Sequence, residues 1–131
     1  PNSEFVDKLI YTMDDAEYQK YAADTLNVFA FSSQSKGFFA MLDSIGEDKI
    51  PQAVKDEFLN AHNLELYNRL KEMSKEKNVS ISALMLSALT SDDNVNTFVQ
   101  IGPRKIEYLT DSMSAKDLRL TPDERGYLMK F

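Results

Sequence analysis

Two short apolar stretches, LNVFAF at residues 26–31 and TFVQI at residues 97–101, decide the predicted fold. Each has the length of a strand and ends in a polar turn, a pattern typical of a strand buried on both faces. Helical patterns lie before, between and after them, so the predicted order is helix, strand, helices, strand, helices. This alternation predicts an α/β fold in which the two strands run parallel.

Capping residues indicate where several helices begin and end. Thr12 followed by Asp15 resembles a helix start, which predicts a helix from Met13 to about Asp24. Between the strands, Asn63 is expected to cap one helix that ends near Asn78, and Ser80 is expected to cap the next.

The segment after the second strand is also predicted to be helical. A helix is expected from Ile106 to about Ala115, with Ile106, Leu109 and Met113 along one side. The sequence TPDE at residues 121–124 combines a capping box with a proline at the first helical position, which predicts a last helix.

Two parallel strands cannot form a self-covering sheet, because their outer edges stay unpaired and their apolar faces stay half open. We therefore expect the 131 residues to be a single segment of a larger protein. The alternative is a mostly helical domain in which both apolar runs are buried loops or helix ends, since periodicity does not distinguish these for such short runs.

Composition excludes several classes of function. The net charge of −6 disfavours nucleic acid and anionic membranes as partners, because both attract basic surfaces. No apolar run approaches the 18 or so residues of a membrane span. Cysteine is absent, which fits a cytoplasmic protein, and His62 is the single histidine, so no metal site is expected. The acidic residues, including Asp92 and Asp93, are explained by solvated loops and caps, and the methionines and aromatics by core spacing.

The turns that follow the two apolar stretches carry residues suited to a polyanion. Residues 32–37, SSQSKG, offer hydroxyl groups, a cation at Lys36 and a glycine that permits close backbone approach. Residues 102–105, GPRK, place two cations where a helix begins, which opposes the helix dipole unless an anion binds there. Each turn could instead be an ordinary solvated turn, but together they predict a ligand with separated phosphate groups.

Three longer stretches carry a resemblance to a known family: VFAFSSQSKGFF at 28–39, NVSISALMLSAL at 78–89 and VQIGPRKIEYLTDSMSAKDLRLTPDE at 99–124. The chain from about Asp14 to Leu128 resembles the C-terminal part of the aldo/keto reductases. The resemblance implies a (β/α)8 TIM barrel, mostly helical in this segment, whose seventh and eighth strands are the two apolar stretches. It also implies reduction of aldehydes and ketones by hydride transfer from NADPH.

The resemblance assigns cofactor-binding roles to residues after each strand. After the first, Phe31 stands where the family stacks an aromatic ring on the nicotinamide. The loop residues implied to contact the pyrophosphate are Ser32, Gln34 and Lys36, although Ser33 and Gln34 replace the family's proline and leucine.

After the second strand the resemblance implies contacts with the adenosine end of the cofactor. Gly102, Pro103 and Arg104 match the turn that holds the ribose and the 2′-phosphate, with Arg104 as the cation for the phosphate. Tyr108 replaces an arginine or glutamine of the family, and this leaves the preference for NADP over NAD open. Asp111 and Ser112 stand near the expected adenine.

No residue of the chain matches the family's catalytic aspartate, tyrosine, lysine and histidine, which lie upstream of this segment. We therefore expect no catalytic residue here and an inactive isolated segment, within a parent oxidoreductase that binds NADP(H) and a small carbonyl substrate. The alternative is a stand-alone half-barrel, a binding or assembly module that self-associates through its strand edges. A third reading is a helical scaffold without a ligand.

Overall fold

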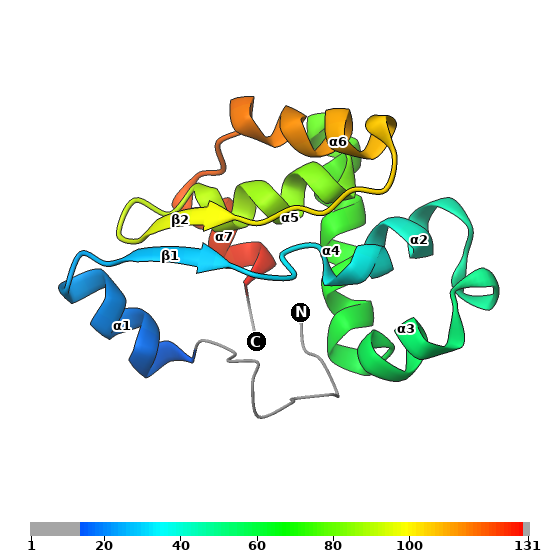
Figure 1. The fold of residues 1–131 in the computed structure, drawn as a ribbon, viewed down its shortest axis with the longest axis horizontal. Coiled ribbons are helices and arrows are strands. Elements are labelled where there is room, and N and C mark those ends of the chain that lie inside the picture. The colour runs from blue at the N-terminus through cyan, green and yellow to red at the C-terminus, as the bar shows by residue number, and fades with distance from the viewer. Residues whose placement is uncertain (1–13, 130–131) are drawn as a thin grey trace.

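The computed structural model describes residues 14–129, which form helices and one small parallel sheet (Figure 1). The sheet consists of β1 (Asn27–Ala30) and β2 (Asn96–Val99), and its register pairs Asn27 with Asn96 and Ala30 with Val99. The predicted α/β character and the parallel direction of the two strands are confirmed. Both strands are one or two residues shorter than the apolar stretches that indicated them.

Seven helices occur in the described residues. They are α1 (Asp15–Ala23), α2 (Phe38–Ser44), α3 (Gln52–Phe58), α4 (Ala61–Lys77), α5 (Ile81–Thr90), α6 (Ile106–Met113) and α7 (Pro122–Leu128). Short 3₁₀ turns join some of them, at Ser35–Gly37, Glu47–Lys49 and Ser114–Asp117. Within residues 14–129 no helix combines the length and the apolar character that a membrane span requires.

The main hydrophobic core lies among the helices rather than under the sheet. Phe38 and Phe39 of α2, Leu70 of α4 and Leu84 of α5 are at most 1% exposed. Together with residues of α3 and α7 they form one continuous cluster. The rings of Phe38 and Phe39 meet edge to face with their centroids 5.1 Å apart, an arrangement that aromatic pairs favour.

The sheet is covered on one face only. Val99, with Ile101 beyond the strand end, packs against Leu86 of α5, while Phe29 and Phe98 on the other face are 64% and 46% exposed. The two phenylalanine rings stack on each other at a centroid distance of 5.1 Å. The prediction that both strands are buried on both faces is therefore wrong, because no described element packs against the second face.

The predicted apolar side of α6 exists, but it faces outward. Ile106 is 75% exposed, Met113 is 50% exposed and Leu109 is 37% exposed. Phe31 and Tyr108 are also exposed, so the expectation that aromatic and methionine residues all belong to the core is wrong for this part of the chain. Because α6 packs on α5 with one face, its remaining apolar surface is exposed to solvent.

Helix ends agree with the predicted caps in part. Ser80 accepts from the Ala83 N–H at 3.0 Å, Asn78 ends α4 in the left-handed conformation, and the capping box at Thr121 is formed. Two caps lie elsewhere than predicted.

The first displaced cap is Asp14, which accepts from the Glu17 N–H at 2.9 Å. Thr12, the predicted start, lies outside the described residues. The second is Asn60, which accepts from the N–H of Asn63 at 2.9 Å. Asn63 is instead a fully buried residue whose amide donates to the Phe58 carbonyl at 2.8 Å, so it serves the turn between α3 and α4.

Two ion pairs link α7 to α4 and to the segment that follows α5. Lys77 Nζ lies 2.5 Å from Glu124, and this contact, with the Thr121 N–H, lowers the pKa of the Glu124 carboxyl below its usual 4.5. Arg125 donates to Asp92 at 2.8 Å, and the Asp92 side chain is only 4% exposed. The prediction that solvation explains Asp92 is therefore wrong, because this carboxylate is a buried partner of an arginine.

Candidate functional site

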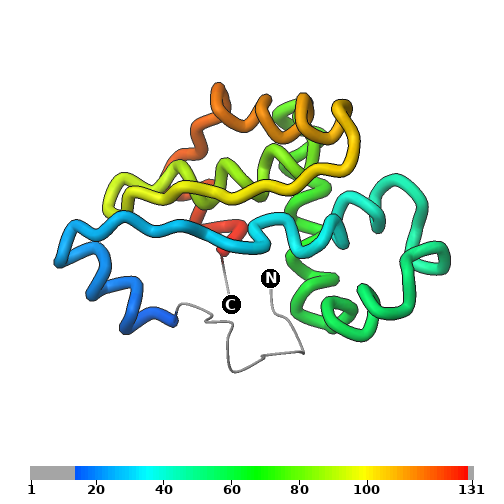
Figure 2. Tube along the Cα trace, viewed as in Figure 1, coloured from blue at the N-terminus to red at the C-terminus, as the bar shows by residue number. Residues whose placement is uncertain are grey.

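The two polar turns lie at the same end of the sheet. Both strands point in one direction, and the chain leaves β1 towards α2 and β2 towards α6 (Figures 1 and 2). The ladder continues one residue beyond β2, where the Gln100 N–H donates to the Ala30 carbonyl at 3.0 Å. Ligands of open parallel sheets and barrels bind at this carboxyl end of the strands.

A side-chain hydrogen bond joins the segments that follow the two strands. Gln34 donates from Nε2 to the Ser112 hydroxyl at 3.1 Å, although the residues are 78 positions apart. Ser112 lies on α6 and is 5% exposed, so this bond sits beneath the surface. The structure therefore brings together one residue from each half of the predicted cofactor site.

The first turn, residues 32–37, has an unusual backbone. Ser32, Ser35 and Lys36 have φ angles of 55°, 49° and 53°, and Gly37 follows at 82°. A residue with a side chain costs roughly 1 kcal/mol or more in this left-handed region, and such strain tends to collect at functional sites. The turn is held by a hydrogen bond from the Ser33 hydroxyl to the Ala30 carbonyl at 2.8 Å.

The same turn leaves backbone donors without acceptors. Within residues 14–129 the N–H groups of Ser33, Gln34 and Lys36 donate no hydrogen bond, whereas those of Ser35 and Gly37 close the turn. Three N–H groups close in sequence at the carboxyl end of β1 thus have no described acceptor, although Ser33 itself is buried. Successive free N–H groups of this kind form concave sites for anions.

Lys36 does not extend freely from this turn as a phosphate-binding cation. Its Nζ lies 2.5 Å from Glu57 Oε2, in a contact whose side chains are 59% and 12% exposed respectively. Glu57 belongs to α3, so the ion pair links the first turn to the helical core. The sequence analysis missed Glu57, because no local spacing indicates a contact across 21 residues.

The second turn leads directly into α6. Gly102 and Arg104 are exposed, and Lys105 is the N-cap residue but makes no side-chain capping bond. The first N–H groups of α6 therefore lack a side-chain acceptor, and the positive end of the helix dipole adds to the two cations. Lys105 Nζ lies 5.6 Å from the centre of the Tyr108 ring, within the range of a cation–π contact.

The remaining predicted residues spread around these turns. Phe31 is 74% exposed beside Ser32, so its ring is accessible at the end of β1. Pro103 is partly buried between its exposed neighbours, and Asp111 is partly buried on α6 next to Ser112. The Gln34–Ser112 bond thus links the first turn to the last turn of α6, while Lys36 is directed towards Glu57 of α3.

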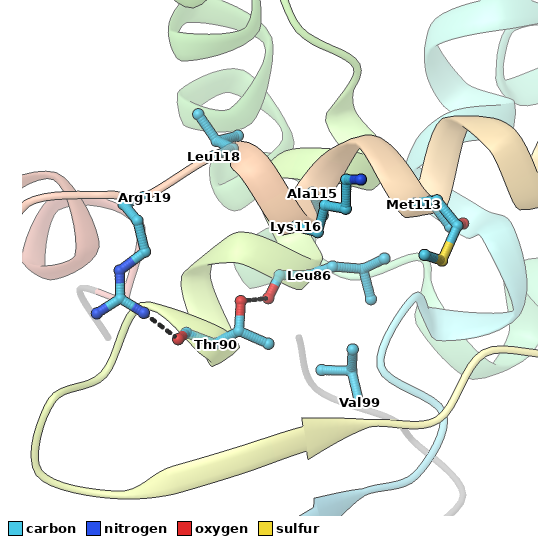
Figure 3. Close-up of a pocket in the computed structure, with 9 residues that line it drawn as sticks. Leu86, Thr90, Val99, Met113, Ala115, Lys116, Leu118 and Arg119 are labelled. Atoms are coloured by element: carbon cyan, nitrogen blue, oxygen red, sulfur yellow. Dashed lines mark hydrogen bonds between the residues drawn. The ribbon is translucent and has the colours of Figure 1, made fainter.

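A cavity of about 260 Å³ lies behind the site, between α5, β2 and α6 (Figure 3). Leu86, Val99 and Met113 supply much of its apolar lining, and Arg119 lies at its rim, where it donates to the Thr90 carbonyl at 2.9 Å. It lies below the usual size range of pockets for drug-sized molecules. This space borders the edge of β2 that pairs with no described strand.

Chemical groups for metal binding or nucleophilic catalysis do not gather at these turns. The described residues contain no cluster of three or more histidines, aspartates or glutamates that could hold a metal ion. The site offers free N–H groups, hydroxyl groups, cations and exposed aromatic rings, which bind anions and planar ligands.

No protein-family model matches the chain, and no curated protein or solved structure matches it either.

Proposed function

We propose that the chain is the NADP(H)-binding C-terminal part of an aldo/keto reductase, an oxidoreductase that reduces aldehydes and ketones. One observation carries the proposal: the two phosphate-suited turns emerge at the same end of a parallel strand pair, and the Gln34–Ser112 bond ties the first turn to α6, the helix that follows the second turn. A dinucleotide cofactor has separated phosphate groups, and so requires two anion sites held at a fixed distance.

Each end of the site suits one end of the cofactor. The free N–H groups of the first turn fit a pyrophosphate, and the exposed Phe31 ring beside them fits the planar nicotinamide. At the second turn, Arg104 and the start of α6 fit the 2′-phosphate, since an arginine fork and free helix N–H groups both donate to phosphate oxygens.

The uncovered sheet supports the barrel part of the proposal. A parallel barrel fills its interior with side chains and pairs every strand edge. Phe29 and Phe98 would then point into the barrel, and strands of the same protein would pair with the outer edges of β1 and β2. Those strands would also carry the catalytic aspartate, tyrosine, lysine and histidine, so the isolated segment would bind and orient the cofactor without turnover.

The substitution Arg104→Ala in the full-length protein tests the assignment of the 2′-phosphate. NADPH affinity, measured by isothermal titration calorimetry, should fall about 10- to 100-fold, the value of a lost charged hydrogen bond. NADH affinity should change less than about twofold, because NADH lacks that phosphate. Lys116→Ala is the matched control: it removes one exposed cation beyond the far end of α6 and should leave both affinities unchanged.

Equal losses for NADPH and NADH would remove Arg104 from the 2′-phosphate site. If the unsubstituted full-length protein bound neither cofactor, the proposed function itself would fail. Reductase activity from the isolated segment would also contradict the account, since no catalytic residue is assigned to it.

A second candidate is an assembly module without catalysis. It is favoured by the apolar surface that α6 and the cavity beside β2 present next to an unpaired strand edge. Sedimentation velocity over a range of concentrations should then show a stable oligomer of the isolated segment. A monomer at all concentrations would exclude this candidate.

A further inference from the structure

Glu57 lies outside both turns, yet its carboxylate contacts Lys36, one of the left-handed residues of the first turn. Its Oε2 accepts from Lys36 Nζ at 2.5 Å, and its side chain is 12% exposed. A carboxylate this far from solvent raises the free energy of the fold unless donors compensate it, and Lys36 supplies part of that compensation. The pair therefore fixes Lys36 relative to α3.

The first turn needs stabilising side-chain contacts, because its left-handed backbone conformation is energetically unfavourable by itself. Three consecutive residues, Ser35, Lys36 and Gly37, lie in the left-handed region, and only the last is a glycine. Strained conformations persist where the surroundings over-determine them. The Gln34–Ser112 and Ser33–Ala30 bonds, with the burial of Ser35 and Phe38, hold the residues on either side of Lys36. The ion pair with Glu57 is the anchor that the Lys36 side chain itself makes.

We propose that Glu57 is a positioning residue of the nucleotide site. Through Lys36 it holds the turn in the conformation that leaves the N–H groups of Ser33, Gln34 and Lys36 free for a pyrophosphate group. The identity of the ligand rests on the proposed function, whereas the anchoring of the turn does not.

A positioning role for Glu57 predicts a change in pyrophosphate affinity opposite in sign to the change that electrostatics alone predicts. The substitution Glu57→Gln removes a negative charge near the anion site and releases Lys36, so charge alone would tighten pyrophosphate binding. If the carboxylate positions the turn, binding should weaken, because the free N–H groups lose their arrangement. The sign of the change therefore separates the two effects.

The experiment measures pyrophosphate affinity by calorimetry and amide hydrogen exchange by NMR in the full chain. In Glu57→Gln we expect pyrophosphate to bind about tenfold more weakly. Exchange at the hydrogen-bonded amides of Ser35 and Gly37 should accelerate about fivefold or more, with the amides of α5 unchanged. Glu124→Gln is the matched control, because it also removes a carboxylate that lies 2.5 Å from a lysine and adds the same charge, but at the contact between α4 and α7 rather than at the turn. It should alter neither quantity.

Tighter pyrophosphate binding by Glu57→Gln, or unchanged exchange at the amides of Ser35 and Gly37, would overturn the positioning role. Faster exchange supports the anchoring whether or not pyrophosphate binds, and a failure of the unsubstituted chain to bind pyrophosphate would count against the proposed function alone. If Glu57→Gln does not fold, Lys36→Met removes the same ion pair from its exposed side. Exchange at the turn should accelerate there as well, and an unchanged rate would overturn the role.

Discussion

The molecule has a closed half and an open half. The closed half, α2, α3, α4, α5 and α7, buries its phenylalanines to at most 4% exposure, and Phe39 is 0% exposed. The open half, α1, β1, β2 and α6, leaves the same type of residue in solvent, and Phe29 is 64% exposed. The difference shows that the closed half has its packing partners within the described residues, whereas the open half leaves apolar side chains without such partners among them.

The candidate site lies where the two halves meet. The first turn begins at the end of β1 in the open half and runs directly into Phe38 of the closed half. Its ion pair reaches Glu57 in the closed half, while its bond to Ser112 reaches the open one. The packed helical core can thus hold the first turn in place even where the neighbouring sheet is uncovered.

The largest expected difference between the halves comes from truncating one phenylalanine in each. Phe39→Ala should lower the free energy of unfolding by about 3–5 kcal/mol, because it leaves a cavity in a packed core. Phe29→Ala should cost less than about 1 kcal/mol, since its ring loses mainly the stack on Phe98. Urea denaturation monitored by circular dichroism measures both.

Similar losses for the two phenylalanine variants would show that the sheet face is covered in solution. A larger loss in Phe29→Ala at high protein concentration only would identify that cover as a second copy of the chain.

A smaller difference is expected between two neighbouring aspartates. Asp92→Asn should destabilise the fold by about 2–3 kcal/mol, because it leaves the arginine partner of a buried carboxylate without its counter-charge. Asp93→Asn should cost less than about 1 kcal/mol, since Asp93 and its partner Arg119 are both mainly exposed. Thermal unfolding of both variants measures the comparison, and an equal shift would contradict the burial of Asp92.

The smallest expected effect is a pH dependence at the α4–α7 contact. The pKa of Glu124 is lowered by Lys77 and by the Thr121 N–H, so its contribution to stability is complete above the ordinary value of 4.5. That contribution is lost as the pH falls through the lowered pKa. Glu124→Gln should therefore be less stable than the unsubstituted chain at pH 7 and converge with it at lower pH. A difference that does not depend on pH would show that this ionisation does not contribute.

Local chemistry made much of the fold predictable. Ser80 and Thr121 cap their helices as expected, because capping needs only a hydroxyl group and an N–H three residues away. Asn63 is predicted as a cap, but Asn60 is the residue that caps α4. Both are amides near one helix start, and only packing shows which of them is buried.

Local sequence patterns could not predict the uncovered face of the sheet or the two long-range contacts of the first turn. Whether Phe29 is buried depends on which elements pack against the sheet, and residue spacing along the chain does not show this. The Gln34–Ser112 and Lys36–Glu57 contacts join residues 78 and 21 positions apart, so periodicity carries no sign of them. The positions of the two turns after successive strands could be predicted, because parallel strands end at the same edge.

The central claim is that the two turns form one nucleotide site, and an NMR titration of the chain with NADP⁺ tests it most directly. The account predicts that the amide signals of Ser33 and Gln34 shift together with those of Gly102 and Arg104, with a single dissociation constant. Shifts confined to one turn, or different dissociation constants for the two, would contradict it.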